Sequence, residues 1–313
     1  MSVISEADFV DLYLGEDFAD AKGLPGQPRR VEAPAEWRAD LERLRLQCME
    51  KQAASQDPEF ALIDDGVVLR VTQLLDLNGK PVFVVSKSSV QIRPLDTLGL
   101  PDYLQDALMS EAVRGLIFIC GEMDAGKTSS AASLVQARLE ALGGICVAVE
   151  GPPEPYLHGR HGNGRCIQVP VSRRRGGYEE ALILALRTRA DLLFVGEVRD
   201  SATAAQVIQA SINGHLIIST GHAGSVTQGI ERLSALAQPL LSNARELLSK
   251  GLVAVIHQSL SKGTDGSRRV TLQSLLFTGD DGPGIREKVR AGKITLLDQD
   301  IANQSSRSLW SDQ

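Results

Sequence analysis

The chain has 313 residues, enough for two modest domains, and 43% of them are hydrophobic, which is ample for packed cores. Its formal net charge of −6 argues against nucleic acid as the main ligand, and no apolar run approaches the ~18 residues of a membrane span. The acidic N-terminus lacks the pattern of a signal peptide, and the four cysteines form no C-x-x-C pair. These features favour a cytoplasmic protein without disulfides or structural zinc.

The first third of the sequence alternates between helix and strand patterns. Residues 37–55 have the composition of a charged amphipathic helix. Residues 66–95 contain apolar strand-like runs that are interrupted at Asn78-Gly79, a dipeptide typical of a tight hairpin turn. We therefore expect a small α+β domain over residues 1–95, followed by a hinge with a short helix over residues 96–115.

From residue 116 onward, strand-like and helix-like segments alternate, which indicates a parallel sheet with helices on its faces. Residues 116–120 (LIFIC) form an apolar run of strand length, and the Ala/Leu-rich residues 129–144 have leucines at helical spacing. The sequence between them, GEMDAGKT, matches the phosphate-binding loop pattern G-x-x-x-x-G-K-[ST]. Residues 116–313 are therefore expected to form an α/β nucleotide-binding domain.

The loop predicts a nucleotide site because backbone N–H groups at a helix N-terminus attract phosphate oxygens. Lys127 is expected to reach the terminal phosphates and Thr128 to hold Mg²⁺. Asp124 is unusual because it places a carboxylate in a loop that binds an anion, although aspartate tolerates left-handed backbone. A chance glycine turn before an ordinary helix is the alternative. The residues assigned to ATP binding are Gly121, Glu122, Met123, Asp124, Ala125, Gly126, Lys127, Thr128 and Ser129.

Hydrolysis needs further groups, because a water molecule must be oriented and Mg²⁺ held. In α/β sheets such groups come from the carboxyl ends of neighbouring strands. Three strand-like segments end in suitable residues: Glu150 with Glu154 close behind, Glu197 followed by Arg199 and Asp200, and His222, with His215 opening the same strand. Each has a structural alternative, such as a helix cap for Asp200 or a hydrogen-bonded core position for His215. Their common position favours a catalytic face.

The segment VGEVRDSATAAQVIQASINGHLIISTGHAGS, residues 195–225, resembles the signature of the PilT/GspE superfamily of secretion and type IV pilus motor ATPases. That family carries a VGE-x-RD box, then GHL, then an STLH box. Further matches follow in order along almost the whole chain. They include FVDLYL at 9–14, QIRPLDTLGLP at 91–101, VAVEGPPEPYLH at 147–158 and LVAVIHQSLSK at 252–262.

The resemblance implies an α/β protein with a PAS-like α+β N-terminal domain (1–95), a hinge (96–115) and a RecA-like P-loop ATPase domain (116–313). It also implies a homohexameric ring, with ATP and Mg²⁺ bound between the two domains. Such a ring is a cytoplasmic motor, peripherally associated with an inner-membrane platform protein of a pilus or secretion machine. No membrane span and no direct contact with nucleic acid are expected.

The same resemblance implies roles for individual residues. Lys127 and Thr128 bind phosphate and Mg²⁺, and Glu197 is the Walker B carboxylate, also close to Mg²⁺. The remaining catalytic assignments are the Asp-box acids Glu150 and Glu154, the His-box residues His215 and His222, and the arginines that approach ATP, Arg70 and Arg93. The chain departs from the family pattern in three places: Asp124 replaces the middle glycine of the loop, Gly151 replaces the Asp-box aspartate, and STGH replaces STLH.

Two motor classes fit, a PilT-like retraction ATPase and the DotB/TraJ group of type IV secretion and conjugation ATPases. Assembly-type members differ because they carry a long N-terminal extension and a four-cysteine insert. A small-molecule kinase or a GTPase is an alternative of another enzyme class, but the sequence has no guanine-reading N-K-x-D motif. A degenerate ring subunit that binds ATP structurally is the third hypothesis, motivated by Asp124 and Gly151.

Overall fold

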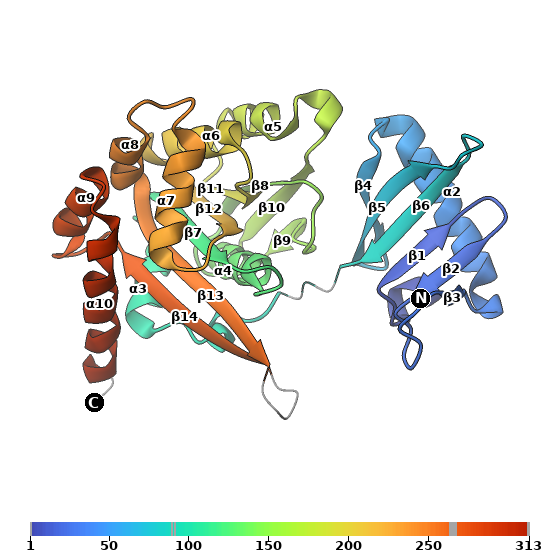
Figure 1. Ribbon diagram of the computed structural model, residues 1–313, viewed down its shortest axis with the longest axis horizontal. Helices are drawn as coiled ribbons and strands as arrows, with labels where there is room; N and C mark the ends of the chain where they lie inside the picture. Colours follow the sequence, from blue (N-terminus) through green and yellow to red (C-terminus); the bar gives the residue numbers. More distant parts are fainter. Residues whose placement is uncertain (1, 89, 91, 263–267, 312–313) are drawn as a thin grey trace. The chain divides into compact units, whose positions relative to one another are not determined.

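The computed structural model describes residues 2–88, 90, 92–262 and 268–311, and it divides into two compact units (Figure 1). The first unit comprises Met1–Val90, Gly151–Tyr156 and Pro170–Gly177. The second unit comprises Gln91–Glu150, Leu157–Val169 and Tyr178–Gln313. Two short segments from the later part of the sequence therefore belong to the first unit.

The first unit contains a six-stranded antiparallel sheet with the order β3-β2-β1-β6-β5-β4. Its strands are β1 (Asp11–Leu14), β2 (Ala19–Lys22), β3 (Val31–Glu32), β4 (Glu59–Asp64), β5 (Val67–Leu75) and β6 (Pro81–Lys87). The predicted hairpin is confirmed, because β5 and β6 pair up to Leu75 and Pro81. In its turn, the Asp76 carboxylate accepts hydrogen bonds from the N–H groups of Asn78 and Lys80, and Gly79 takes a φ of 77°.

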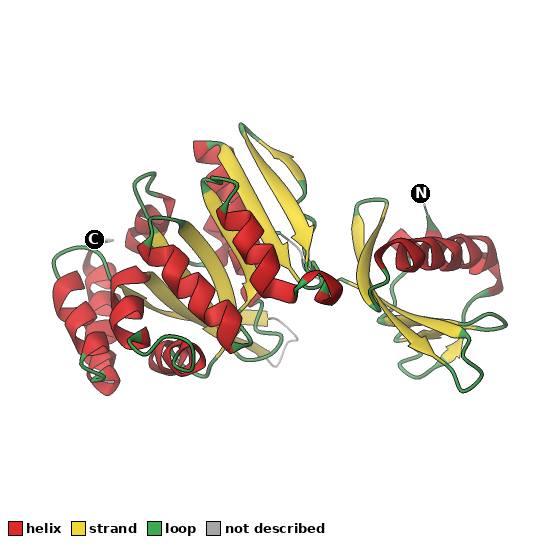
Figure 2. Cartoon of the chain, turned by 90° about the horizontal axis from the view of Figure 1, so that it is seen from above, coloured by secondary structure: helices red, strands yellow, loops and turns green. Residues whose placement is uncertain are grey.

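The core of the first unit lies between the sheet and helix α2 (Arg38–Ser55), the helix predicted over 37–55 (Figure 2). A 3₁₀ turn (Ala35–Trp37) leads into α2, and a short helix, α1 (Val3–Glu6), precedes the sheet. The apolar residues of α2 recur at helical spacing, so they share one face. The buried residues of that face are Leu41, Leu44 and Cys48, and they pack with Leu12, Val71 and Phe83 of the sheet.

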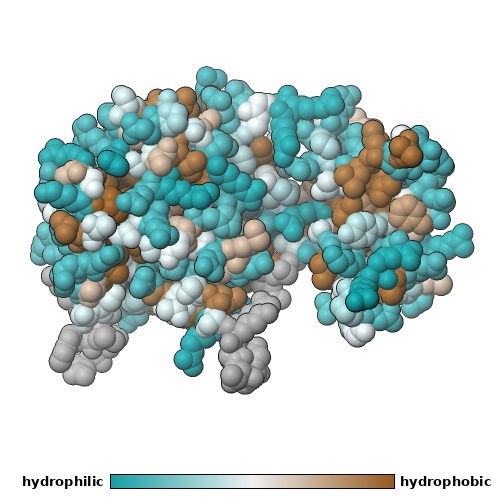
Figure 3. All heavy atoms as spheres, viewed as in Figure 1, coloured by the Kyte–Doolittle hydropathy of each residue, from teal (hydrophilic) through white to brown (hydrophobic). Residues whose placement is uncertain are grey.

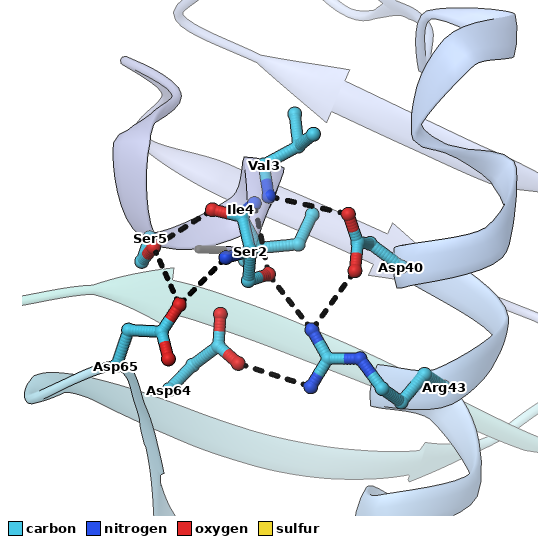
Figure 4. A network of polar contacts seen from close by, with 8 residues as sticks. All are labelled: Ser2, Val3, Ile4, Ser5, Asp40, Arg43, Asp64 and Asp65. Atoms are coloured by element: carbon cyan, nitrogen blue, oxygen red, sulfur yellow. Dashed lines mark hydrogen bonds and ion pairs between the residues drawn. The ribbon is translucent and has the colours of Figure 1, made fainter.

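A polar network ties α1 and α2 to the end of β4 (Figure 4). Arg43 on α2 donates hydrogen bonds to Asp40 (3.0 Å), to Asp64 (3.1 Å) and to the Ser2 hydroxyl (2.8 Å). The Ser2 hydroxyl in turn accepts from the N–H of Ile4 and caps α1. Because the Arg43 side chain is partly exposed, we expect the network to orient α1 more than it stabilises the unit.

The second unit is built on an eight-stranded sheet with the order β14-β13-β7-β12-β11-β8-β10-β9. Its strands are β7 (Gly115–Gly121), β8 (Gly144–Glu150), β9 (Gly159–His161), β10 (Gly164–Pro170), β11 (Leu192–Glu197), β12 (Leu216–His222), β13 (Leu252–Lys262) and β14 (Arg268–Leu276). From β13 to β8 the neighbours run parallel, as predicted, and β14 and β9 each pair antiparallel with one neighbour. Every residue of β7 is buried, as expected for a central parallel strand.

Helices cover both faces of this sheet (Figures 1 and 2). The helices that follow the first unit's sheet in the chain are α3 (Asp102–Met109), α4 (Lys127–Leu142), α5 (Gly177–Leu186), α6 (Ser201–Ile212), α7 (Val226–Ala237), α8 (Ala244–Gly251), α9 (Gly282–Arg290) and α10 (Leu297–Ser311). Because side chains of β7 alternate between faces, Ile117 and Ile119 pack with α3 and α4, while Phe118 and Cys120 face Gly229 of α7.

The segment expected to be a hinge, residues 96–115, contributes α3, whose Leu104 and Leu108 are fully buried in the core of the second unit. The buried guanidinium of Arg138 on α4 donates to the carbonyls of Leu108 and Ser110, where α3 ends. A cation at a helix C-terminus interacts favourably with the helix dipole. Most of this segment is therefore fixed to the second unit.

Hydrophilic side chains cover much of the face seen in Figure 3, and an extended group of hydrophobic residues on that face lies on the first unit. Within the described residues, no helix combines the length and apolar character that crossing a bilayer requires.

The α2 face gives a stability prediction. Leu44 is 1% exposed, whereas Leu46, two residues along the same helix, is 48% exposed. Leu44→Ala should lower the free energy of unfolding by about 2–5 kcal/mol, because it removes buried methyl groups and leaves a cavity. Leu46→Ala is the matched control and should change it by less than about 1 kcal/mol. Denaturant titrations of both variants measure the difference, and equal effects would contradict the assignment of the buried face.

Candidate functional site

The phosphate-binding loop begins at the end of β7, between the end of β12 and the middle of β13. In the register of the sheet, Gly121 at the end of β7 lies opposite His222 of β12 on one side and Gln258 of β13 on the other. A Cβ atom on Gly121 would lie 2.1 Å from the carbonyl oxygen of Gln258. Only glycine permits this close approach of backbone to backbone, and the chain then turns into the loop.

The loop itself contains two residues with left-handed backbone. Gly126 has a φ of 83°, and Asp124 has a φ of 59°. For a residue with a side chain this conformation costs roughly 1–2 kcal/mol, and aspartate is among the residues that tolerate it best. The side chains of Glu122, Met123 and Asp124 are exposed, whereas Ala125 is buried. The loop therefore presents its acidic residues to solvent and keeps its C-terminal half against the sheet.

Lys127 is the first residue of α4, and its side chain is largely buried. Its Nζ donates to the carbonyl of Glu122 at 2.5 Å and lies 3.4 Å from Nδ1 of His222. Thr128 and Ser129 follow in the first turn of the helix and are half-buried. The loop thus places one ammonium group beside the start of α4, where the helix dipole also favours an anion.

Glu197 ends β11 and lies in the same group of side chains. Its Oε1 is 3.2 Å from Nε2 of His222, and its Oε2 accepts from Nε (2.7 Å) and Nη2 (2.6 Å) of Arg199. His222 therefore connects the carboxylate of Glu197 with the ammonium group of Lys127. Asp200 has the structural role instead, because its carboxylate accepts from the N–H of Thr203 at 2.8 Å and caps α6.

The predicted Asp-box residues separate in the structure. Glu150, at the end of β8, is buried and accepts from Nε2 of Gln168 at 2.8 Å. A Cβ on Gly196 would lie 3.2 Å from its Cγ, so it is next to the end of β11. Glu154 belongs to the first unit, where its Oε1 accepts from Nη1 of Arg70 at 2.9 Å. Two residues predicted to act at the nucleotide are therefore paired with each other here.

Arg93 and His215 complete the predicted set. The Arg93 side chain is exposed, and its N–H donates to the hydroxyl of Ser133 on α4 at 3.0 Å. His215 precedes β12, and its carbonyl accepts from the N–H of Gly115 at the start of β7. Because β12 runs from that end to His222, seven residues further on, the two histidines are about 23 Å apart at ~3.3 Å per residue. Within one chain, His215 does not join the group around Lys127.

Two functional candidates on β13, His257 and Gln258, were not found by sequence reasoning. His257 lies opposite Cys120, and its Nε2 is buried with no hydrogen-bond partner in the described part of the chain. Burial lowers the pKa of His257; the Glu122 carboxylate opposes this shift, and the Lys127 ammonium adds to it. The only indication in the sequence was two polar residues at the end of the apolar run LVAVI.

Thr128 and Glu197 suit a nucleotide-bound Mg²⁺. Among the described residues, no three or more His, Cys, Asp or Glu side chains are grouped so that they could hold a metal by themselves. Mg²⁺ in nucleotide sites needs only one or two protein oxygens, since phosphate oxygens and water fill its other positions. A hydroxyl at the start of α4 and a carboxylate at the end of β11 are ligands of the right chemistry.

Comparison with known proteins identifies one family. Residues 45–299 match the family model of type II/IV secretion system proteins. The type IV pilus retraction ATPase PilT of Pseudomonas aeruginosa is 25% identical over 295 residues, which is 92% of this chain and 83% of that protein. A twitching motility protein of Neisseria gonorrhoeae is 28% identical over 204 residues, 65% of this chain and 53% of its own length. The chain thus spans about half of that second relative.

Solved structures agree with this fold. The pilus retraction motor PilT with bound ADP has a TM-score of 0.75 at 23% identity, covering 95% of this chain and 88% of that one. The ATPase DotB of Legionella pneumophila has a TM-score of 0.72 at 19% identity, covering 94% and 85%. The chain therefore has the predicted α/β architecture, a RecA-like ATPase domain preceded by a smaller N-terminal domain.

His257 predicts a pH dependence of stability. The pKa of His257 is lowered in the folded state from its ordinary value of 6.5. Below about pH 6.5 this histidine therefore binds a proton more readily in the unfolded chain, and the free energy of unfolding falls as the pH falls. In His257→Asn this contribution is absent. We expect the Tm of the wild type to fall relative to that of the variant between about pH 8 and about pH 5.5. A constant difference in Tm over this range would contradict the prediction.

Asp124 predicts an effect on nucleotide affinity. Asp124→Gly removes a negative charge beside a polyanion and relieves left-handed strain, so ATP should bind more tightly. The charge part should shrink as salt rises, because ions screen exposed charges. Asp124→Asn is the matched control, since it removes the charge and keeps a side chain that tolerates this backbone. A gain in affinity that is independent of salt in both variants would show that the charge is irrelevant.

Proposed function

The chain belongs to the type II/IV secretion system protein family, and we propose that it is the ATP-hydrolysing motor subunit of a type IV pilus or a related secretion machine. The observation that carries the proposal is the continuous contact from Lys127 through His222 to Glu197, at the carboxyl ends of β7, β12 and β11. A cation for phosphate and a carboxylate for water, held at a fixed separation, are the groups that hydrolysis of a phosphoanhydride requires.

Binding is assigned to the loop and the first turn of α4. Phosphate oxygens carry negative charge, so the Lys127 ammonium and the N–H groups at the start of α4 stabilise them. Thr128 and Glu197 would hold Mg²⁺, which would neutralise charge on the phosphates. The Glu122 carbonyl accepts a hydrogen bond from Lys127. The lysine ammonium has three N–H donors, so it can bind phosphate oxygens as well as that carbonyl.

The proton positions on His222 follow from its two neighbours. The Lys127 ammonium can only donate, so Nδ1 of His222 acts as the acceptor. Nε2 then carries the proton and donates to the Glu197 carboxylate. This hydrogen bond orients the Glu197 carboxylate. Glu197 can then accept a hydrogen bond from the attacking water and take up its proton.

Coupling of hydrolysis to movement is assigned to the arginines and to a ring of copies. An arginine that reaches the terminal phosphate stabilises the charge that builds up during transfer. The exposed side chain of Arg93 suits that role, with its backbone anchored to Ser133. Arg70 must first leave Glu154, and its release would make the chemistry depend on a conformational change. We propose a homohexamer that works at the cytoplasmic side of an inner-membrane platform protein.

Pilus retraction is the first candidate for the biological role, because PilT of P. aeruginosa aligns over 92% of this chain. Type IV secretion or conjugation is the second candidate, favoured by the similarity in fold to DotB. A subunit that binds ATP without hydrolysing it is the alternative of another class. It is distinguished from both motors by turnover.

Two substitutions test the enzymatic proposal. Lys127→Ala should abolish detectable ATP binding, because it removes the cation that faces the phosphates, whereas Lys250→Ala, an exposed lysine on α8, is the matched control and should bind ATP normally. Glu197→Gln should retain ATP affinity and lose turnover by about 10²- to 10⁴-fold. Fluorescent-nucleotide titration and phosphate release measure the two properties. Normal ATP binding by Lys127→Ala, or full turnover by Glu197→Gln, would contradict the proposal.

A further inference from the structure

Gln258 connects the phosphate-binding loop to helix α4 from the interior of the second unit. Its side chain is 3% exposed. Nε2 donates to the carbonyl of Ala125 in the loop at 2.6 Å, and Oε1 accepts from the hydroxyl of Ser130 in the first turn of α4 at 2.7 Å. The orientation of the amide follows from chemistry, since a backbone carbonyl can only accept and must face the NH₂ group. Both ends of the amide are therefore used on the loop and the helix that follows it.

The bond to Ala125 decides which way one peptide group of the loop points. The carbonyl of Ala125 and the N–H of Gly126 belong to the same peptide, and in a trans peptide these groups point in opposite directions. Gln258 holds the carbonyl toward β13, so the N–H of Gly126 points away from β13. Gln258 is buried on the β13 side of this peptide, so the N–H of Gly126 is directed to the opposite side, where an anion could bind. Gly126 also permits the contact, since a Cβ there would lie 2.9 Å from Nε2.

The surroundings of Gln258 give no other reason for an amide at this position. Together with Ser130 it borders a small cavity that is otherwise lined by apolar side chains, among them Leu108, Leu134 and Leu272. A buried polar side chain costs free energy unless it is hydrogen-bonded, so the amide is explained by its two bonds, to the Ala125 carbonyl and from the Ser130 hydroxyl. The NH₂ group of the amide binds the Ala125 carbonyl of the phosphate-binding loop.

We infer that Gln258 is a positioning residue, which holds the peptide between Ala125 and Gly126 in the orientation that receives phosphate before a nucleotide arrives. The inference rests on the proposed function of the loop. It matters more in this chain because Asp124, next to Ala125, has left-handed backbone, and such strained residues persist only when surrounding contacts hold them. Gln258 supplies one of those contacts.

Gln258→Met tests the inference, because it keeps the size of the side chain and removes both hydrogen bonds. We expect the Kd for ADP and the KM for ATP to rise about tenfold, the effect of losing one hydrogen bond that leaves a buried carbonyl without a partner. At saturating ATP, kcat should change by less than about twofold, because no group that touches the reacting atoms is altered.

Gln304→Met is the matched control. Gln304 on α10 is also buried, and its amide also binds backbone, accepting from the N–H of Leu276 at 2.8 Å and donating to its carbonyl at 3.0 Å. Both variants should lower Tm, but only Gln258→Met should weaken nucleotide binding. Unchanged affinity in Gln258→Met, or an equal loss in Gln304→Met, overturns the inference.

A double-mutant cycle tests the link to Asp124. If Gln258 opposes strain at Asp124, the affinity loss from Gln258→Met should fall from about tenfold to about threefold in the Asp124→Gly background, since the unstrained loop needs less support. An equal loss in both backgrounds contradicts the strain argument.

Ser130→Ala gives a second route if Gln258→Met does not fold. It frees one end of the amide and should weaken ADP binding about threefold without changing kcat, and full affinity would overturn the inference. Failure of the wild type to bind ADP at all would instead reject the proposed function together with this inference.

Discussion

Strands β12 and β13 flank β7 so that His222 and Gln258 both lie opposite Gly121, and the nucleotide site depends on this register. The contact is close, since there is no room for a Cβ on Gly121 beside the carbonyl of Gln258. A shift of one residue would turn each of these side chains to the other face of the sheet. The residues of β7 are all buried, and alternate side chains pack against the helices on opposite faces of the sheet. A shift of one residue would bring each side chain against the helices of the other face, so this packing prevents it. The core of the second unit therefore fixes the site.

From that register follow two sets of contacts on opposite sides of the loop. On the β12 side, His222 joins the Lys127 ammonium to the Glu197 carboxylate, so the group assigned to phosphate and the group assigned to water are held at a fixed separation. On the β13 side, Gln258 holds the loop by its backbone. In the proposed mechanism, the contacts of His222 position the groups that bind phosphate and activate water. The contacts of Gln258 hold the backbone conformation of the phosphate-binding loop. Asp124 makes the second set more important than it is for a loop with glycine at that position.

Sequence reasoning identified what depends on local patterns. The phosphate-loop spacing, the Asn78-Gly79 hairpin and the helix over 37–55 are each encoded within a few residues, and the ordered motifs from 9 to 262 identified the fold. His215 shows a limit of motif reasoning. His215 precedes β12 and His222 ends it, so the two histidines of the motif lie at opposite ends of the same strand. The strand pattern of the sequence already placed His215 at the start and His222 at the end of one strand, whereas the motif grouped both histidines together.

The remaining contacts join residues far apart in the sequence. Gln258 meets Ala125 across 133 positions, and Arg70 meets Glu154 across 84. Neither pair has a spacing rule, because the partners are brought together by the sheet register or by the packing of a later loop into the first unit. The burial of Leu104 and Leu108 of α3 likewise depends on tertiary packing. Local composition indicated a hinge over residues 96–115. The apolar face of α3 packs against residues that are distant in the sequence, so its burial could not be predicted from that segment.

The most direct test of this account is steady-state phosphate release from ATP by the purified wild-type chain, with Mg²⁺ and with the metal removed by a chelator. If Lys127, His222 and Glu197 form a hydrolytic site, the chain releases phosphate over many turnovers in the presence of Mg²⁺, and release stops when Mg²⁺ is withdrawn. Tight ATP binding with no phosphate released under either condition would contradict the account and leave a subunit that holds ATP only as part of its structure.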